Sequence, residues 1–453
     1  MTASLVPVLL FFALAAPVCP PGAMPISVTG PWTVTVGPGT VTVDGEVHGL
    51  NQPVSVEIPS PPTRAVVDER HTALPVFNPK TGGWRRGTRL RRLITQETAA
   101  AGRLLPDSVQ VRAEPNGDSP WRAGTDYKCD PEWATLGRLD GGAIGPETPV
   151  YVSYRYQPDR VDLLVLNTAG AVELIRGEPA LGAVPLPEVP AGAVALGAVW
   201  VPGLLGLSDE HPHLEDEFCH PIAHPEVHPA EDKAAIRGAV PKTLAKLQAG
   251  KPVTIVAWGD SVTHGGGTET GDDWYQHQFL RRLQARFPES EITLLTAAWG
   301  GASSKRYLEA SAGGEHDFQR EVLDPKPDLV TIEFVNDAYL HGPALANHYA
   351  PVVKRIQATG AEVLFFTPHL VRQDWMGLKA TAKVTQDPRP YTQDLRAFAH
   401  EQGLALADAA YVWSNLWKQG IPYMTLLANS INHPNARGHR IFADVLLRFF
   451  PKD

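Results

Sequence analysis

The strongest constraint on the fold is a regular alternation of apolar strands and amphipathic helices from about residue 241 onward. The segments expected to be strands are short and almost continuously apolar, which is typical of strands buried on both faces of a parallel sheet. They are TIVAW (254–258), EITLLTA (291–297), DLVTIEF (328–334), EVLFFTP (362–368) and LALADA (404–409). Expected helices lie at 241–249, 272–287, 343–360, 391–403 and 435–450. The alternation predicts an α/β domain with a doubly wound parallel sheet over residues 241–453.

The first part of the chain has a different pattern, with alternating β segments between turn clusters rich in Gly, Pro and Asn. WTVTV, PVYVSYRY and RVDLLVLN are examples, and no long amphipathic helix occurs before residue 230. We therefore expect a β-rich accessory domain over residues 26–180, built as a sandwich. It contains no motif for a nucleophile.

A Pro-rich and then His-rich segment, residues 181–240, is expected to form an extended linker between the two domains. Its histidines, which stand among several carboxylates, are His211, His213, His220, His224 and His228. Imidazoles and carboxylates together can bind zinc or copper. Because the prolines prevent the histidines from sharing one helix face, we interpret the segment as a solvated acidic linker and predict no metal site.

The first 24 residues have the features of a secretory signal peptide. An apolar run of the usual length is followed by the cleavage pattern Ala13-Leu14-Ala15. The run is too short to span a bilayer well, so we expect a secreted or periplasmic protein without stable membrane insertion. In such a compartment Cys129 and Cys219 either form a disulfide or remain two isolated thiols. The net charge of −9, with scattered Lys and Arg, argues against a nucleic-acid partner.

Polar motifs follow the carboxyl ends of the predicted strands, which is where ligands bind in doubly wound sheets. They are Gly259-Asp260-Ser261, Trp299-Gly300-Gly301, Asn336-Asp337 and Asn432-His433-Pro434. A hydroxyl, backbone N–H groups beside glycine, an amide and an imidazole therefore converge on one edge of the sheet. This set of groups suits acyl transfer, which needs a nucleophile, a base and donors for an oxyanion.

Two other interpretations of the Gly-rich segment after the first strand are excluded by its residues. A P-loop requires Lys after its glycines, and GGGTETG (265–271) has none. The nucleophile elbow of α/β-hydrolases requires Gly two residues after the serine, where this chain has Thr263.

These four motifs resemble the blocks of the SGNH (GDSL-type) hydrolase superfamily, over residues of about 250–450. The resemblance implies a flavodoxin-like doubly wound sheet, with Ser261 as nucleophile and His433 as general base. It also implies an oxyanion hole formed by the N–H groups of Ser261 and Gly301 and the side chain of Asn336. The mechanism that it implies needs no metal and no organic cofactor.

The chain departs from the family where the acid of the triad is expected. The family has Asp three residues before the histidine, and this chain has Ser430 there, preceded by Asn429. Three interpretations follow. Asn429, Ser430 or a backbone carbonyl orients His433, an acid from elsewhere in the chain reaches it, or the enzyme is weak or inactive.

The sequence thus predicts a secreted serine esterase that hydrolyses carboxylic esters through an acyl-serine, with O-acetyl groups on a polysaccharide as the expected substrate. One alternative is a catalytically weak or inactive SGNH protein that acts in extracellular carbohydrate binding or adhesion. Another is a lipase or lysophospholipase-type esterase, although no amphipathic membrane-binding segment is found.

Overall fold

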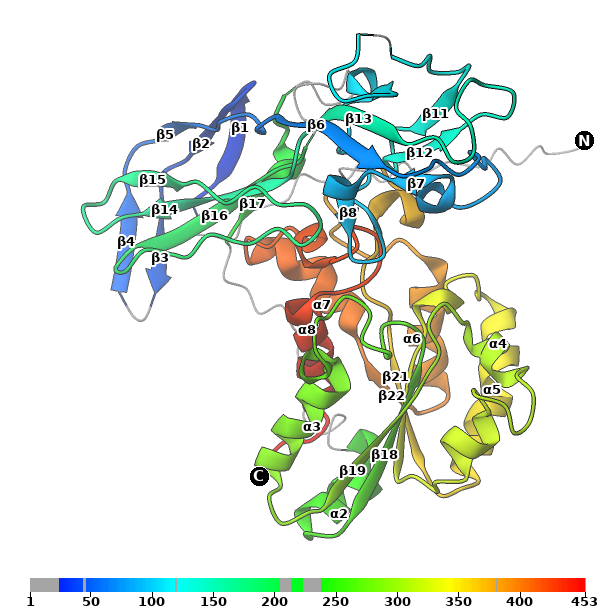
Figure 1. Ribbon diagram of the computed structural model, residues 1–453. Helices are drawn as coiled ribbons and strands as arrows, with labels where there is room; N and C mark the ends of the chain where they lie inside the picture. The colour runs from blue at the N-terminus through cyan, green and yellow to red at the C-terminus, as the bar shows by residue number, and fades with distance from the viewer. Residues whose placement is uncertain are drawn as a thin grey trace, which may run out of the picture.

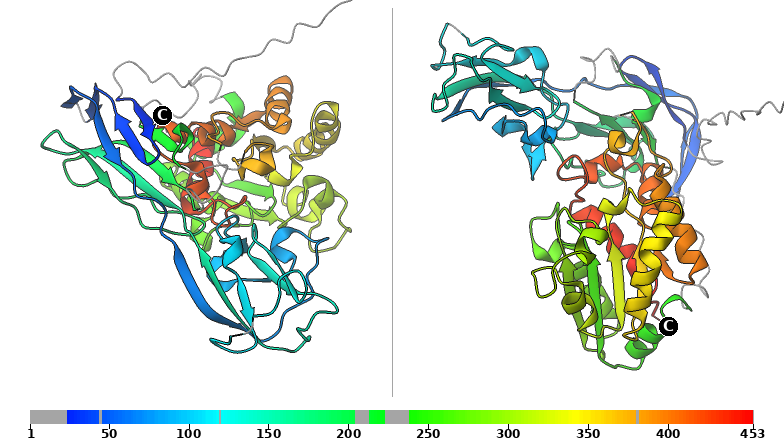
Figure 2. Two further views of the ribbon diagram at one scale, coloured as in Figure 1. Left: turned by 90° about the horizontal axis from the view of Figure 1, so that it is seen from above. Right: turned by 90° about the vertical axis from the view of Figure 1, so that its right-hand side faces the viewer.

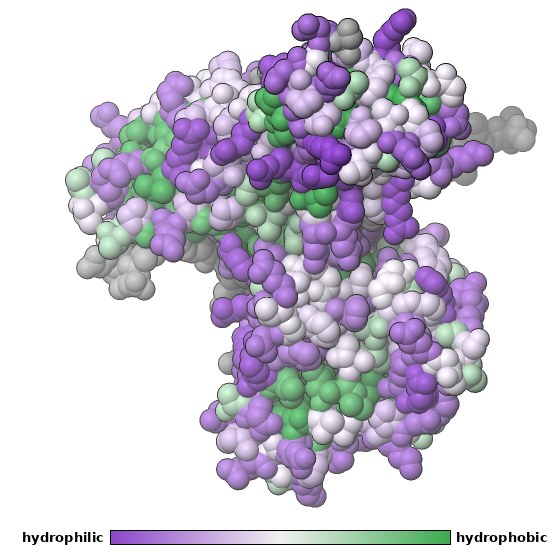
Figure 3. All heavy atoms as spheres, viewed as in Figure 1, coloured by the Kyte–Doolittle hydropathy of each residue, from purple (hydrophilic) through white to green (hydrophobic). Residues whose placement is uncertain are grey.

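The computed structural model describes residues 24–43, 46–118, 120–203, 213–222, 238–379 and 382–452. The signal peptide predicted for residues 1–24 lies, apart from Met24, outside these residues. Figure 1 shows a β-rich upper part and an α/β lower part, which meet at a narrow waist that is also seen in the space-filling view of Figure 3.

The α/β part contains a five-stranded parallel sheet in the order β19-β18-β20-β21-β22. Its strands are β18 (Val253–Gly259), β19 (Ile292–Ala298), β20 (Leu329–Glu333), β21 (Glu362–Phe366) and β22 (Ala405–Ala407). Its α-helices are α2 (Pro241–Gln248), α3 (Tyr275–Arg286), α4 (Ser304–Leu308), α5 (Pro343–Gln357), α6 (Pro390–Glu401), α7 (Ala409–Asn415) and α8 (Ala436–Leu447). The predicted doubly wound α/β fold is confirmed.

Helices cover both faces of this sheet because successive strand residues point to opposite sides. In β18, Ile255 belongs to one core together with Phe279 of α3 and Phe442 of α8. Its neighbour Val256 belongs to a second core, with Tyr349 of α5. Each fully buried side chain of this size contributes about 2 kcal/mol of stability. The apolar runs in the sequence therefore fix which strands lie between the two helix layers.

The β-rich part contains two separate cores. In the first, the sheet β1-β2-β5 packs on the sheet β15-β14-β16-β17, and the hairpin β3-β4 lies at its edge. These strands are β1 (Ile26–Gly30), β2 (Thr33–Val36), β3 (Gly39–Val43), β4 (Glu46–Leu50), β5 (Val54–Glu57), β14 (Arg160–Leu166), β15 (Val172–Ile175), β16 (Val194–Val201) and β17 (Cys219–Pro221).

The second core lies between the sheets β10-β13-β6 and β11-β12-β7. Its strands are β6 (Arg64–His71), β7 (Thr88–Arg89), β10 (Gln110–Arg112), β11 (Tyr127–Asp130), β12 (Thr135–Arg138) and β13 (Val150–Tyr156). A short hairpin, β8 (Ile94–Thr95) and β9 (Thr98–Ala99), extends from this part toward the α/β part in Figures 1 and 2. The predicted β-rich character is confirmed, but it is divided between two cores instead of one sandwich.

The segment expected to be an extended linker contains a central strand, which corrects that expectation. Residues 194–201 form β16, which pairs with both β14 and β17 and is almost entirely buried. The sequence VALGAVWV is apolar enough for such a strand, but the prolines before it suggested an unpaired chain. Of the five histidines of this segment, His213 and His220 are described. Within the described residues, no group of three or more His, Cys, Asp or Glu is placed to hold a metal.

Cys129 and Cys219 are both free thiols, so the disulfide considered from the sequence is not formed. Cys129 lies in β11 and Cys219 in β17, which belong to different cores. Burial raises the pKa of each thiol to about 12, which keeps both protonated and unreactive at neutral pH. In the ranges that the structure describes, no helix combines the length and the apolar character needed to cross a bilayer.

Candidate active site

Two side chains that are far apart in the sequence meet at the carboxyl end of the sheet. The Ser261 hydroxyl, directly after β18, lies 3.0 Å from Nε2 of His433. His433 lies in the loop before α8 and is 5% exposed, whereas Ser261 is partly exposed. A hydroxyl that is hydrogen-bonded to an imidazole in a partly open position is the arrangement that nucleophilic catalysis requires.

The glycines after Ser261 allow its loop to pack directly against the histidine loop. A Cβ on Gly266 would lie 3.0 Å from the His433 ring. A Cβ on Gly267, which has a φ of +97°, would lie 2.0 Å from the backbone oxygen of Pro434. Side chains at these positions would push the two loops apart. The glycines therefore allow the short distance between Ser261 and His433.

Gly267→Ala is expected to lower kcat for ester hydrolysis by about 10²-fold, because a shift of about 1 Å in a catalytic group has an effect of that size. Gly360→Ala is the matched control, since Gly360 has a similar φ of +96° but open space around its Cβ position. Both variants carry the same backbone strain, and only Gly267→Ala displaces His433. Equal kcat values for the two variants would contradict this explanation.

Asp260 connects the serine loop to the Asn336 segment. Its carboxylate accepts hydrogen bonds from the backbone N–H of Val262 at 3.1 Å and of Asn336 at 2.9 Å. The Asn336 amide donates one hydrogen bond to the carbonyl of Ala302 at 3.2 Å, which leaves its second hydrogen free to bind another acceptor. These contacts hold the amide and the serine in fixed relative positions.

Two backbone N–H groups near Ser261 have no acceptor within the described residues. They belong to Ser261 itself and to Gly301. Gly301 has a φ of +72°, and a Cβ at this position would meet no atom within 4 Å. Together with the second hydrogen of the Asn336 amide, these groups are hydrogen-bond donors at the carboxyl end of the sheet that have no acceptor in the described part of the chain.

Three buried carboxyl groups lie beneath these loops. Burial raises the pKa of Asp260 to about 7 and raises the pKa of Glu333 well above its usual range. Burial also raises the pKa of Asp337, although hydrogen bonds from Ser304 and Tyr349 to its carboxylate act in the opposite direction. Each of the three carboxyls accepts hydrogen bonds from neighbouring groups, so their role here is to hold the loops in place.

The loop that carries His433 is organised by Asn429. The Asn429 side-chain oxygen accepts hydrogen bonds from the backbone N–H groups of Ile431, Asn432 and His433, at 2.9–3.0 Å. Ser430 has a φ of +58°, an uncommon value for a residue other than glycine. Asn429 and Ser430 were both considered as groups that orient the His433 ring. Neither side chain makes a hydrogen bond to that ring; Asn429 holds the backbone instead.

A residue that the sequence analysis did not identify lies beside the other ring nitrogen of His433. Oε2 of Glu97, in the turn of the β8–β9 hairpin, is 3.2 Å from Nδ1 of His433. The carboxylate is outside the angular range of a hydrogen bond, and Nδ1 has no other partner in the described part of the chain. Glu97 comes from the β-rich part and has no motif around it, so no local signal in the sequence could have identified it.

Burial lowers the pKa of His433, and the negative charge of Glu97 partly opposes this shift. His433 is therefore neutral at neutral pH and can accept a proton at Nε2. His369 and His439, which lie near it, also have pKa values lowered by burial; that of His439 falls to about 4. Both are uncharged under the same conditions.

Residues 257–441 match the model of the GDSL-like lipase/acylhydrolase family. These residues form a GDSL-like hydrolase domain. The matched range contains Ser261, Gly301, Asn336 and His433. A search of curated proteins finds no match.

Solved structures similar to the chain include two esterases and a lipolytic protein of the G-D-S-L family. A two-domain esterase active on acetylated mannans is 19% identical, with a TM-score of 0.39, and the match covers 47% of this chain and 52% of that one. This chain thus matches about half the length of that esterase. A lipolytic G-D-S-L family protein from Veillonella parvula is 18% identical (TM-score 0.32; 43% and 96% covered). The esterase EstA from Pseudoalteromonas sp. is 18% identical (TM-score 0.31; 43% and 93% covered).

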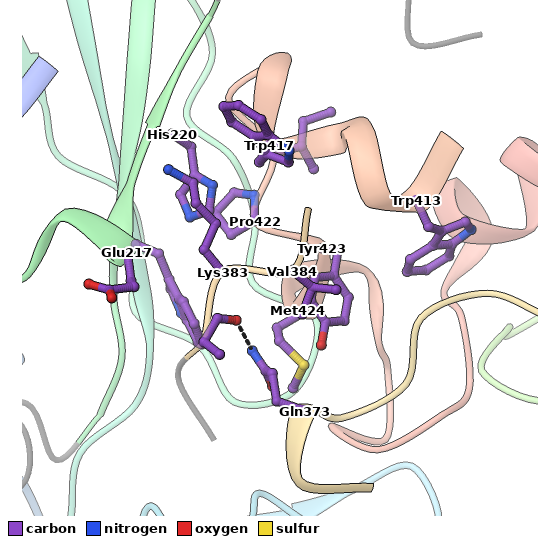
Figure 4. A pocket seen from close by; sticks show the side chains of 13 residues that line it. Glu217, His220, Gln373, Lys383, Val384, Trp413, Trp417, Pro422, Tyr423 and Met424 are labelled. Atoms are coloured by element: carbon purple, nitrogen blue, oxygen red, sulfur yellow. Dashed lines mark hydrogen bonds between the residues drawn. The ribbon is translucent and has the colours of Figure 1, made fainter. Parts of the chain in front are cut away.

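A separate apolar pocket, whose lining does not include Ser261, lies between the β-rich part and the GDSL-like domain (Figure 4). It is lined by Trp200 and His220 from the β-rich part and by Trp413, Trp417 and Tyr423 from the domain. Burial lowers the pKa of His220 well below its usual value, which keeps this side chain uncharged. No Ser, Thr or Cys is among the described residues that line the pocket, and we assign it to packing between the two parts.

Proposed function

We propose that the chain is an exported esterase that removes O-acetyl groups from carbohydrate through an acyl-serine intermediate. In this proposal residues 1–24 direct export, residues 241–453 carry out the reaction, and the β-rich part is an accessory domain. The observation that carries the proposal is the hydrogen bond from Ser261 to His433 beside two backbone N–H groups without acceptors.

The proposed reaction begins when the Ser261 oxygen attacks the ester carbonyl while Nε2 of His433 takes the hydroxyl proton. The N–H groups of Ser261 and Gly301 and the free hydrogen of the Asn336 amide bind the oxyanion. His433 then gives its proton to the leaving alcohol, and an acyl-serine remains. Water, deprotonated by His433, attacks this intermediate and releases the acid and the free serine.

The surroundings of the serine favour a small acyl group on a polar alcohol. The space next to Gly301 is open, and exposed side chains near Ser261 and His433 include His264 and Glu97. Figure 3 shows a largely hydrophilic surface along the waist, where the β8–β9 hairpin meets the α/β part. A lipid substrate would need a broad apolar surface beside the nucleophile, whereas hydroxyl groups of a sugar can bind polar side chains. Tyr339, which is 53% exposed, also offers an aromatic face close to Asn336.

The proposal is tested by comparing kcat/KM for p-nitrophenyl acetate, butyrate and octanoate, together with acetate release from acetylated xylan and glucomannan. We expect acetate to be preferred over octanoate by at least about tenfold, and we expect acetate release from at least one polysaccharide. A preference for octanoate would favour the lipase alternative. If neither the esters nor the polysaccharides are hydrolysed, the chain is a binding or adhesion protein and the proposal is wrong.

A further inference from the structure

The base of the proposed reaction has a buried ring nitrogen that lacks a hydrogen bond. His433 uses Nε2 for Ser261, so its proton must be on Nδ1 when it acts as a base. Nδ1 is buried, and among the described residues no group makes a hydrogen bond with it. The family's Asp would occupy this position, but the chain has Ser430 instead. A partner for Nδ1 must therefore come from another segment.

Glu97 is the carboxylate within reach of this nitrogen. The distance from its Oε2 to Nδ1 is 3.2 Å, which is within hydrogen-bonding reach. The Glu97 side chain is 60% exposed while the His433 side chain is 7% exposed. The carboxylate therefore approaches the buried imidazole from the solvent side.

The hairpin that carries Glu97 is anchored to the catalytic loop. The Thr98 hydroxyl donates a hydrogen bond to the backbone oxygen of Asn429 at 2.8 Å, so the residue after Glu97 is bound to the loop that holds His433. Arg89 of β7 donates hydrogen bonds to the carbonyls of Glu97 and Thr98 in the hairpin. Gly182 packs close to both segments, since a Cβ there would lie 2.6 Å from the Ala428 oxygen.

A second set of contacts holds the β-rich part beside the same loop. The Arg372 backbone N–H donates a hydrogen bond to the Ile431 oxygen at 2.7 Å, and its guanidinium forms an ion pair with Glu132 of the β-rich part. The guanidinium also lies 5.1 Å from the ring of Trp133. These contacts connect the catalytic loop to both the strands and the hairpin of the β-rich part. The position of Glu97 is therefore part of a well-packed interface.

We propose that Glu97, supplied by the β-rich part, is the positioning residue that replaces the missing acid of the Ser–His–Asp triad. This inference rests on the proposed function. The Glu97 carboxylate accepts the Nδ1–H of His433, which fixes the tautomer with a free Nε2 and stabilises the imidazolium formed when Ser261 loses its proton. No proton passes to Glu97, and the proton on Nε2 leaves with the alcohol as described above.

The test compares the full-length enzyme with its Glu97→Gln, Glu97→Asp and Gln96→Ala variants on p-nitrophenyl acetate. Glu97→Gln is expected to reduce kcat by about 10²- to 10⁴-fold, up to the loss that follows when the orienting Asp of a serine protease becomes Asn. Glu97→Asp keeps the carboxylate, so its kcat should be at least tenfold higher than that of Glu97→Gln. Gln96→Ala, in the same exposed turn, should stay within about twofold of the parent.

The pH dependence separates a positioning role from a structural one. The side chains that affect the titration of His433 are Glu97 from the hairpin, His369 from the segment after β21 and His439 from α8, and both histidines are neutral. The charge of Glu97 raises the pKa of His433, so its removal lowers that pKa further. The acid limb of kcat/KM should therefore move to lower pH in Glu97→Gln and stay in place in Gln96→Ala.

The outcomes distinguish this inference from the proposed function. If the parent hydrolyses the ester and Glu97→Gln keeps its kcat and its acid limb, the esterase assignment stands and the role of Glu97 is wrong. A lower kcat with an unmoved acid limb, without recovery in Glu97→Asp, would also overturn the positioning role. An inactive parent would instead contradict the function itself. Thermal unfolding of each variant, followed by circular dichroism, verifies that the exposed substitution leaves the fold intact.

Discussion

Ser261→Ala is expected to lower kcat for p-nitrophenyl acetate by about 10⁶-fold, the size of loss seen when the nucleophile of a serine hydrolase is removed. The variant keeps the backbone N–H groups at Ser261 and Gly301, so it should still bind ester and retain a small rate above that of water. Its free energy of unfolding should change little, because the hydroxyl is partly exposed and has a single hydrogen bond to His433. Steady-state kinetics with active-site titration of the parent measures this effect.

Ser414→Ala provides a matched control for this change. Ser414 lies in α7, it is 4% exposed, and its hydroxyl has no hydrogen-bond partner among the described residues. We expect its kcat to remain within about twofold of the parent, as for most substitutions away from functional groups. If Ser261→Ala retains more than about a hundredth of the parent's kcat, an acyl-serine at this position is excluded and the mechanism must be replaced.

Asn336→Ala is expected to lower kcat by about 10²- to 10³-fold with little change in KM, as removal of one oxyanion donor does in a serine protease. The free hydrogen of the Asn336 amide would bind the oxygen most strongly when that oxygen carries negative charge. The loss therefore falls on the transition state and not on substrate binding. Kinetics on p-nitrophenyl acetate at saturating and limiting substrate separate the effect on kcat from the effect on KM.

The control for the amide is Asn415→Ala. Asn415 is 8% exposed, and its side-chain amide donates a hydrogen bond to the backbone carbonyl of Tyr411. The Asn336 amide likewise donates to a backbone carbonyl, that of Ala302. It should reduce stability by about 1 kcal/mol and leave kcat unchanged. A rise in KM with an unchanged kcat in Asn336→Ala would show that the amide binds the ester in its ground state, against the oxyanion role.

Most of the α/β fold could be predicted because its strands are buried on both faces. A segment such as DLVTIEF (328–334) is apolar almost throughout, which is typical of a strand buried on both faces. The strand β20 occupies residues 329–333 of it. In the β-rich part the prediction was weaker. β16 follows a Pro-rich stretch, and its apolar residues satisfy two neighbouring strands that lie far away in the sequence. Such non-local pairing has no local signature.

The candidate site was also predictable only in part. Ser261 and His433 stand in recognisable motifs at strand and helix ends, and the structure brings them to hydrogen-bonding distance. The partner of His433 Nδ1 could not be found in this way. The sequence offered Asn429 and Ser430 because they are close to His433 along the chain, whereas Glu97 reaches it through the packing of two separately folded cores. An exposed glutamate in a hairpin looks like any other solvated residue.

The hydrogen bond from Thr98 to Asn429 joins residues 331 positions apart, and this separation has a consequence for how the site forms. Contacts of such length are formed only after a large loss of chain entropy, so they are completed late in folding. A chain in which the parallel sheet has formed but the hairpin has not yet docked would have Ser261 beside an imidazole without its carboxylate. If Glu97 has the proposed role, hydrolytic competence would then arise in the last assembly step.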